Sequence, residues 1–273
     1  MGHLQGDNII DDTLRYKGYL DTPDLWTGSL LNLRQFCFID KNNLGINDRT
    51  KFMRLGLLTE QFFFKKLKSI PGIRTIAKNL QIIQDNKTVG EIDCLLLMHN
   101  MPIHVELVYK FYLFDPAITG NEIDKWIGPN RNDSLNQKIK KLTEKQLPLI
   151  NHKKTQEIIH SLGHNSSSFE QGVSFKAQLF IPQGFDEKKI KLLNRKCIIG
   201  AYIRLNEMNV YADHSFYIPQ KLDWLIAPHS DVKWLSFKDC ISVVQDQHLL
   251  KRSVMIWIKS KTSLKKCFVV FWN

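Results

Sequence analysis

Residues 90–113, GEIDCLLLMHNMPIHVELVYKFYL, decide the fold class of this 273-residue chain. Two runs of largely apolar residues, 89–98 and 103–113, flank the short segment 99–102 (HNMP). Alternation with β-branched and aromatic residues indicates strands, and a short turn-forming connection between two such runs is typical of a hairpin. The stretch therefore predicts two antiparallel strands. Because the first run is apolar at its centre, we expect that strand to lie inside a sheet.

The hairpin also carries ionisable side chains where a buried strand would have none. Side chains alternate between the two faces of a strand, so Glu91 and Asp93 share one face of the first strand, and Glu106 and Lys110 share one face of the second. A turn around Asn100-Met101 places Asp93 diagonal to Glu106, within reach of one bound cation. This geometry depends on the assumed register, because a slip of one residue would separate the two acids.

The segment 51–68, KFMRLGLLTEQFFFKKLK, predicts a helix ahead of the hairpin. Glu60 interrupts an apolar stripe of this helix, with Leu57 and Phe64 at helical spacing on either side. A carboxylate that faces the core is costly unless it is paired or binds a metal ion. We therefore expect Glu60 to converge with the two strand acids.

The remaining segments predict an α/β fold in which helices flank a mixed central sheet. A strand near 74–84 precedes the hairpin and is joined to it by a turn at Asp85-Asn86-Lys87. A helix near 133–147, capped by Asn132 or Asp133, follows the hairpin. Residues 151–172 are polar and predict a loop or short helix, and the chain is β-rich from residue 174 onward.

Composition limits the kinds of binding partner and the cellular compartments that we expect for this protein. A formal net charge of +11 favours a polyanionic partner, which is either nucleic acid or an anionic membrane surface. The sequence has neither the roughly 18 consecutive apolar residues of a membrane helix nor a signal peptide pattern at its start, so we expect a cytoplasmic protein. The five cysteines are scattered and form no CxxC pair, which argues against a zinc knuckle or a disulfide framework.

Three carboxylates beside a lysine suit Mg²⁺ or Mn²⁺ with several retained waters. Such an ion can generate a hydroxide and stabilise charge on a phosphoryl group. We expect Glu60, Asp93 and Glu106 to hold the ion, and Lys110 to stabilise developing charge or position the attacking water. The alternative is a structural network in which these acids pair with nearby cations.

Candidate phosphate contacts follow the hairpin directly. They are Asn130 and Arg131 in a turn-rich stretch, and Lys138, Lys141 and Lys145 on or near the outer side of the next helix. The alternatives are a helix-entry loop capped by Asp133 and an ordinary solvated helix face.

The segments 90–93 (GEID) and 105–108 (VELV) resemble the GEID…VEVK hairpin of the PD-(D/E)XK superfamily, which includes archaeal Holliday junction resolvases and restriction endonucleases. This resemblance implies a restriction-endonuclease-like core in which Asp93, Glu106 and a helix acid, here Glu60, bind the metal. The superfamily lysine lies two residues after the glutamate, where this chain has Val108. Lys110 is two residues further along the same face.

A wider resemblance, to the bacterial domain-of-unknown-function family 1853, covers most of the chain. Its segments are 54–60 (RLGLLTE), 78–81 (KNLQ), 90–93, 104–113 and 126–148. That family has been grouped with PD-(D/E)XK folds and brings no established substrate. We therefore expect one domain, with a helical lead-in over 1–50, a nuclease-like core over 51–150 and a β-rich part over 151–273.

The function predicted from these features is metal-dependent hydrolysis of DNA phosphodiesters. Two alternatives stay open. One is a catalytically inactive nuclease-like module that binds nucleic acid, and the other is a protein-interaction domain whose carboxylates are structural.

Overall fold

The computed structural model describes residues 12–38 and 54–272. In these ranges, nine strands form one mixed sheet in the order β3-β4-β5-β7-β8-β11-β10-β9, with β6 paired beside β5. The central strands β5, β7, β8 and β11 are parallel, whereas the outer strands pair antiparallel. The strands are β3 (Ile73–Gln84), β4 (Lys87–Met98), β5 (Met101–Phe114), β6 (Trp126–Ile127), β7 (Glu170–Pro182), β8 (Ile198–Arg204), β9 (Ser215–Tyr217), β10 (Val254–Lys259) and β11 (Leu264–Val270).

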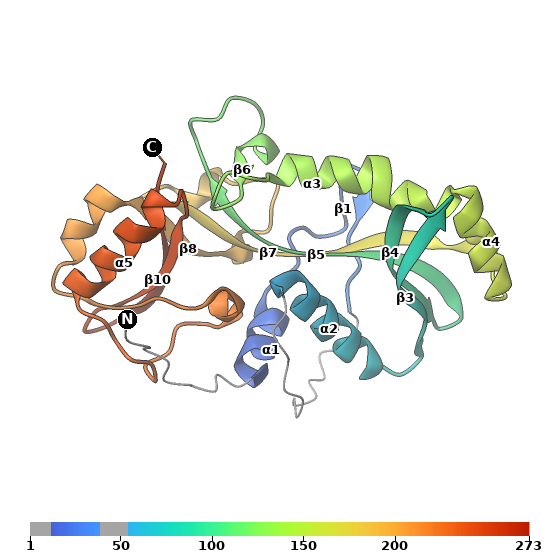
Figure 1. Cartoon of the computed structure of the whole chain (residues 1–273), viewed down its shortest axis with the longest axis horizontal. Helices are drawn as coiled ribbons and strands as arrows, with labels where there is room; N and C mark the ends of the chain where they lie inside the picture. Colours follow the sequence, from blue (N-terminus) through green and yellow to red (C-terminus); the bar gives the residue numbers. More distant parts are fainter. Residues whose placement is uncertain (1–11, 39–53, 273) are drawn as a thin grey trace.

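Helices cover both faces of this sheet (Figure 1). α1 and α2 pack on one face through an apolar cluster that includes Tyr16, Leu58 and Val105, and α3 packs on the other through one that includes Leu135 and Val108. The mixed α/β sheet flanked by helices is therefore confirmed. The helices are α1 (Asp12–Asp21), α2 (Leu55–Lys68), α3 (Leu135–Lys141), α4 (Lys153–Ser161) and α5 (Phe237–Leu249).

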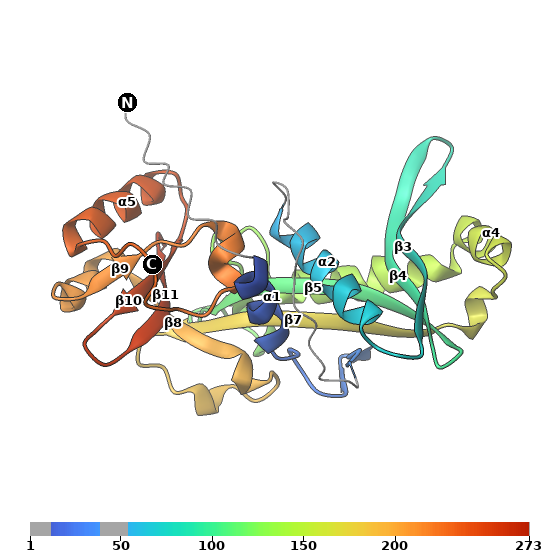
Figure 2. The ribbon, with the colours of Figure 1, turned by 90° about the horizontal axis from the view of Figure 1, so that it is seen from below.

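Two tight hairpins join β3, β4 and β5, as the sequence predicts. Asp85 and Asn86 have φ of 50° and 58°, and His99 and Asn100 have φ of 50° and 69°. Two central residues with positive φ match the twist of flanking strands in a two-residue hairpin. The second turn lies one residue earlier than expected, because Met98 pairs with Met101. Figure 2 shows β3 and the start of β4 rising away from the rest of the sheet.

The predicted helix over 133–147 needs two corrections. Its N-cap is Ser134, whose side chain accepts a hydrogen bond from the Gln137 amide, rather than Asn132 or Asp133. The helix also passes through a π-helical turn, Leu142–Gln146, and a 3₁₀ turn, Leu147–Asn151, before it ends. Pro148 does not stop it, because a proline in the first turn of a helical segment needs no amide donor.

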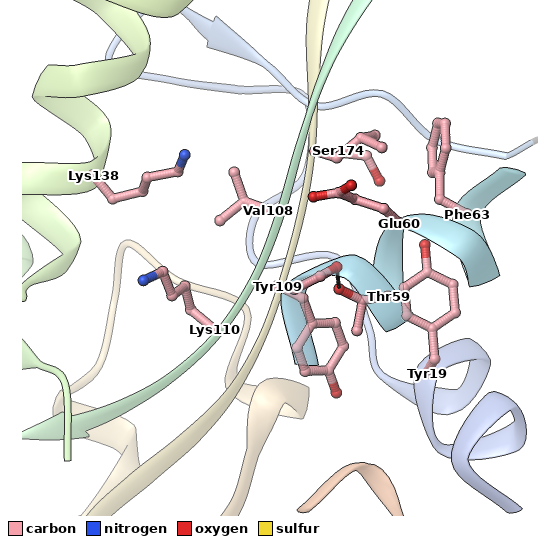
Figure 3. Close-up of a pocket in the computed structure, with 11 residues that line it drawn as sticks. Tyr19, Thr59, Glu60, Phe63, Val108, Tyr109, Lys110, Lys138 and Ser174 are labelled. Atoms are coloured by element: carbon pink, nitrogen blue, oxygen red, sulfur yellow. Dashed lines mark hydrogen bonds between the residues drawn. The ribbon is translucent and has the colours of Figure 1, made fainter. Parts of the chain in front are cut away.

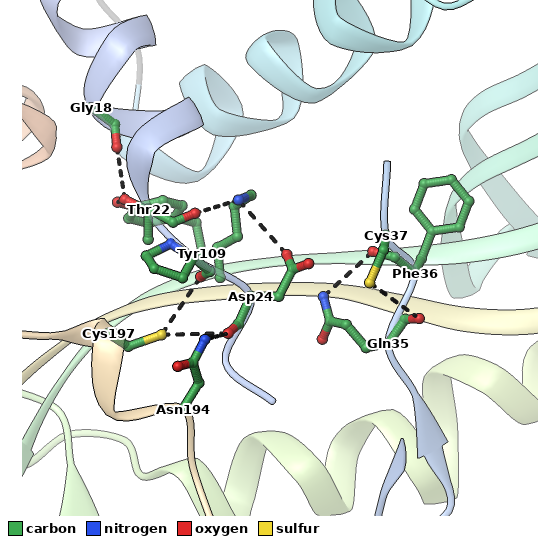
Figure 4. Close-up of polar contacts among 11 residues, drawn as sticks. Gly18, Thr22, Asp24, Gln35, Phe36, Cys37, Tyr109, Asn194 and Cys197 are labelled. Carbon is green, nitrogen blue, oxygen red and sulfur yellow. Dashed lines mark hydrogen bonds and ion pairs between the residues drawn. The ribbon is translucent and has the colours of Figure 1, made fainter. Parts of the chain in front are cut away.

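The described part of the lead-in is only partly helical. After α1 the chain is largely extended and forms the two-stranded sheet β1 (Ser29–Leu30) and β2 (Leu33–Arg34). It docks on β7 through backbone hydrogen bonds to Val173 and Phe175, and the carbonyl of Asp24 accepts from Asn194 (Figure 4). Expectations for 1–11 and 39–53 lie outside the described residues.

The C-terminal part is β-rich, as expected, but it also contains α5, which the sequence reading did not predict. The short 3₁₀ turn η8 (Lys221–Leu225) packs beside α1. Within 12–38 and 54–272, no helix is long and apolar enough to cross a membrane.

Candidate functional site

The sheet opens into a fork between β4 and β5. Their ladder runs from Met98↔Met101 to Cys94↔Val105 and then stops. One step further, Asp93 would face Glu106 directly rather than diagonally. Instead, a carboxylate oxygen of Asp93 accepts a hydrogen bond of 2.8 Å from the Leu107 amide. In the part of the chain that the structure describes, no strand pairs with this edge of β5 between Glu106 and Tyr112.

A pocket lies at this open edge. It is lined from α1, α2, β5, β7 and α3, and its polar lining includes Tyr19, Thr59, Glu60, Lys110, Lys138 and Ser174. Figure 3 shows Lys110 and Lys138 on the α3 side of β5 and Glu60 on the α2 side. The departure of β4 from β5 therefore lets side chains from opposite faces of the sheet meet at one edge.

Glu106 is fully buried, and both of its oxygens accept hydrogen bonds. Oε1 lies 2.9 Å from Nε2 of His104, and Oε2 lies 2.5 Å from Nε2 of Gln146. Gln171 donates from its amide nitrogen to the carbonyl of Leu147 and lies 3.0 Å from Nδ1 of His104. Because that amide nitrogen is a donor, Nδ1 is the acceptor and Nε2 carries the hydrogen that points at Glu106. His104 therefore fixes the orientation of the Glu106 carboxylate.

Asp93 lies in an environment that disfavours its charge. Burial is the main cause that raises the pKa of Asp93 to about 8, and the negative charges of Glu106 and Glu60 raise it further. The Leu107 amide and the Lys138 ammonium act in the opposite direction. A carboxylate that is both desolvated and crowded by other carboxylates is typical of functional sites.

Glu60 is half-buried on α2, and its Oε2 accepts a hydrogen bond of 3.3 Å from the Asn79 amide on β3. Burial raises the pKa of Glu60. The apolar stripe that we predicted on either side of Glu60 is partly wrong, because Leu57 is 48% exposed and belongs to no buried stripe. Glu60 nevertheless lines the pocket, and its charge acts on Asp93. The helix acid and the strand acids thus belong to one electrostatic cluster.

Lys110 reaches the pocket, but its ammonium is bound to another group. Its Nζ donates to Oδ2 of Asp133 at 2.5 Å, and both side chains are more than a third exposed. Exposed ion pairs of this kind stabilise a protein by about 0–1 kcal/mol. Lys110 is therefore held toward the start of α3, by the residue that had been expected to cap that helix.

Lys138 points inward, which corrects its expected place on the outer side of the helix. It lies three residues after Leu135 and four before Leu142, and both of these leucines are fully buried. Residues at these spacings share a helix face. Burial lowers the pKa of Lys138 to about 8, and the charges of Asp93 and Glu106 oppose this shift. Lys138 is thus the ammonium that faces the strand acids.

Gln146 joins Lys138 to Glu106, a role that was not predicted from the sequence. The Lys138 ammonium donates to Oε1 of Gln146 at 2.8 Å, while Nε2 of the same amide donates to Glu106. Gln146 is the last residue of the π-helical turn. Such turns change the phase of a helix and occur frequently at functional sites. No local sequence pattern distinguishes this glutamine, because its role depends on that change of phase.

The other candidate phosphate contacts fall into two groups. Lys141 and Lys145 are exposed. Asn130 and Arg131 instead contact the C-terminal part or nearby acids. The Asn130 side chain accepts from the Ser253 amide, and the Arg131 guanidinium lies 2.8 Å from Asp115 and 4.8 Å from the Trp272 ring centroid.

The predicted three-ligand metal set stays a prediction. Within residues 12–38 and 54–272, no three side chains of His, Cys, Asp or Glu are arranged to share one metal ion. Glu60 approaches from the face of the sheet opposite to Lys138 (Figure 3). The two strand acids and the helix acid therefore interact electrostatically without forming a closed ligand cage.

The family model for Domain of unknown function (DUF1853) matches residues 39–265. The chain belongs to this family. The match covers α2, the three-stranded hairpin unit, α3 and most of the C-terminal strands, so the fork and its pocket lie inside the family domain. Neither a curated protein nor a solved structure matches the chain. Membership of the DUF1853 family confirms that resemblance, while the likeness to nucleases stays a hypothesis.

Proposed function

We propose that this protein is a metal-dependent nuclease of the PD-(D/E)XK type that hydrolyses phosphodiester bonds in DNA. The observation that supports it best is the fork, where the half-buried carboxylate of Asp93 and the buried carboxylate of Glu106 meet the inward ammonium of Lys138 at the open edge of β5. A helix on each face of a mixed sheet, with the acids on adjacent antiparallel strands, agrees with a restriction-endonuclease-like core.

The donor chemistry of the fork fits Mg²⁺ or Mn²⁺. Magnesium keeps several waters and is commonly held by only one or two carboxylates together with substrate phosphates, so a closed cage of three acids is not required. Asp93 and Glu106 would hold the ion, and Glu60 would bind one of its waters. The crowding that disfavours the charge on Asp93 is the condition that a cation relieves.

The bound ion would supply Lewis-acid stabilisation of the phosphoryl group. The residues of the chain would orient the metal-binding carboxylates and neutralise the negative charge of the phosphate. His104 and Gln146 fix both oxygens of Glu106, so its rotamer is set before a ligand arrives. Lys138 places a positive charge beside the acids, where it would stabilise negative charge that develops on the phosphate. Lys110 would serve as a second, outer cation.

The exposed lysines Lys141 and Lys145 lie one and two turns after Lys138 on the same helical segment. We infer that they hold the phosphate backbone as it enters the pocket, in line with the net charge of +11. Asn130 and Arg131 would contribute mainly by fixing the loop ahead of α3, since their polar groups already have partners within the chain.

The decisive experiment is cleavage of plasmid, single-stranded, flap and junction DNA with Mg²⁺ or Mn²⁺. We expect cleavage by the wild type, loss of cleavage in Asp93→Ala, and wild-type activity in Asp85→Ala, which removes an acid from the distant β3–β4 turn. If no substrate is cut and the wild type behaves like Asp93→Ala, the nuclease proposal is wrong.

A second candidate is a module that binds DNA without cutting it. The observation that favours it is Val108 at the position of the superfamily lysine, together with the pairing of Lys110 to Asp133. Such a module would bind DNA with a steep salt dependence and gain no activity from either metal. Binding measured by fluorescence anisotropy at several salt concentrations, alongside the cleavage assay, distinguishes the two functions.

A further inference from the structure

The ladder of β3 with β4 has register shifts at Thr75/Ala77 and at Ile82/Ile83, and between them Asn79 leaves the extended backbone conformation. Its φ is +49°, in the left-handed region that residues other than glycine seldom adopt. Lys78 pairs with Cys94 and Leu80 pairs with Ile92, but the pair between them, Asn79 and Asp93, is missing from the ladder. The backbone thus leaves β geometry directly opposite the strand acid.

Asp93 therefore stands at a double interruption. The β3–β4 ladder skips it, and the β4–β5 ladder stops one residue before it. The register is the same on both sides of Asn79, so this break inserts no extra residue and is not a β-bulge. Here breaks on both sides of one residue free the Asp93 carboxylate to reach the Leu107 amide.

The distortion also changes where Asn79 points. Consecutive residues of a regular strand face opposite sides of the sheet. Lys78 nevertheless lies over the ring of Phe64 with its Nζ 5.8 Å from the centroid, and Asn79 donates to Glu60, so both neighbours contact α2. Glu60 and Phe64 are four residues apart, on one face of that helix. The left-handed residue thus brings a second consecutive side chain to the same helix face.

We propose that Asn79 is a positioning residue, whose left-handed backbone serves to turn its amide onto Glu60 and hold that carboxylate toward Asp93 at the fork. Strain in the backbone is maintained only where the surrounding structure over-determines it, and such strain concentrates at functional sites. Asparagine is suited to this task because it tolerates the left-handed region and carries an amide donor. The proposal extends the proposed nuclease function and rests on it for its metal readout only.

The metal readout compares two glycine substitutions. Asn79→Gly keeps the backbone geometry and removes the amide. Asn86→Gly does the same at the β3–β4 turn, where φ is +58° and which is not part of the pocket lining. Removing an outer-shell partner of a metal site typically weakens metal affinity about 10–100-fold. Because Glu60 would bind a water of the ion rather than the ion itself, the lower end of this range applies to Asn79. We expect a loss of this size in Mn²⁺ affinity, measured by calorimetry, for Asn79→Gly and a change below about twofold for Asn86→Gly, with both variants folded as judged by circular dichroism. Equal affinities for the two variants would overturn the proposal.

A second readout needs neither metal nor activity. In metal-free protein with labelled asparagine, we expect the side-chain amide resonances of Asn79 to move clearly on Glu60→Gln and by much less on Glu91→Gln. Glu91 is the matched control, since its charge also acts on Glu60 but its side chain pairs with Gln81 instead of Asn79. If the resonances ignore Glu60→Gln, Asn79 does not hold Glu60 and the proposal fails. If they respond while the wild type binds no Mn²⁺, the positioning contact stands and the nuclease proposal fails alone.

Discussion

The protein places a lysine and an aspartate in each of two regions, half-buried at the fork and buried beside η8, and their polar partners differ between the two. At the fork, Lys138 and Glu60 line an open pocket, and the charges of Glu60 and Glu106 act on Asp93. Beside the turn η8, Lys266 donates to Gln178 at 2.9 Å and to the carbonyl of Trp224, while Asp223 accepts from Arg15 at 2.7 Å.

The difference separates a structural polar network from a site. Around η8 each charged group has a partner within the chain, and Lys266 and Asp223 are almost fully buried. At the fork the charge of Asp93 is opposed by Glu106 and Glu60, and Glu60 and Lys138 line a cavity. Burial lowers the pKa of both lysines, to about 8 for Lys138 and to about 7 for Lys266. Burial of a lysine by itself is therefore a weak marker of a functional site. Several carboxylates close together beside a cavity are a stronger marker.

The largest expected effect tests whether the fork lysine is the functional one. Lys138→Met should lower the cleavage rate by about 100–1000-fold, the usual loss when one group that stabilises transition-state charge is removed. Lys110→Met should lower it by less than about tenfold, since its ammonium is engaged by Asp133 in an exposed pair. Single-turnover rates on the best DNA substrate measure both, and a larger loss for Lys110→Met would reverse the assignment.

The two aspartates should respond oppositely to the same change. Asp93→Asn removes a crowded charge and keeps an acceptor for the Leu107 amide, so it should stabilise the metal-free protein by about 1 kcal/mol, or about 2–4 °C. The folded pKa of Asp93, about 8, lies above its unfolded value, so this gain should grow as the pH rises from 4 to 8. Asp223→Asn breaks a buried pair with Arg15 and should destabilise by about 3 kcal/mol.

Urea denaturation in a chelator at pH 5 and pH 8 measures both aspartate variants. Destabilisation by Asp93→Asn at pH 8 would show that the carboxylate has a structural partner, and the contrast between the two regions would disappear.

The buried lysine beside η8 should affect how the free energy of unfolding depends on pH, rather than the activity. The pKa of Lys266 is lowered to about 7 by burial, so between pH 7 and 10 the unfolded state binds more protons than the folded state. Stability supplied by this position therefore rises with pH in that window. The difference in unfolding free energy between wild type and Lys266→Met should change by about 2 kcal/mol from pH 7 to pH 9. A difference that is constant with pH would contradict the lowered pKa.

The smallest expected effect concerns the salt dependence of DNA binding. Lys141→Ala and Lys145→Ala should each lower the salt slope of binding by about one unit, as expected for the loss of one phosphate contact. Arg131→Ala should leave the slope unchanged but destabilise the protein, because it leaves Asp115 buried without its guanidinium partner. Anisotropy titrations from low to moderate salt test this, and a reduced slope for Arg131→Ala would restore the loop ahead of α3 as a phosphate contact.

Much of the site could be predicted from local sequence. The alternation over 89–113 fixes the hairpin, and the short turn fixes its register to within one residue, so Asp93 and Glu106 come together without knowledge of the rest of the chain. Lys138 was predicted as a phosphate contact because of its charge, and on the outer side of its helix. Its spacing from Leu135 and Leu142, which are both buried, indicates the inward direction that the structure shows. Gln146 and Asn79 were not identified, because each acts through a local departure from regular geometry.

The sequence by itself determined the strands, the two tight turns, the helix that carries Glu60 and the proximity of the two strand acids, because these depend on side-chain periodicity and turn chemistry between near neighbours. Only the tertiary structure decided which lysine faces the acids, that Lys110 binds Asp133, and that Asn79 and Gln146 hold the carboxylates. Those contacts join residues that are 8 to 40 positions apart across different elements. Their geometry is set by how a π turn and an interrupted ladder shift the packing, and no local pattern encodes it.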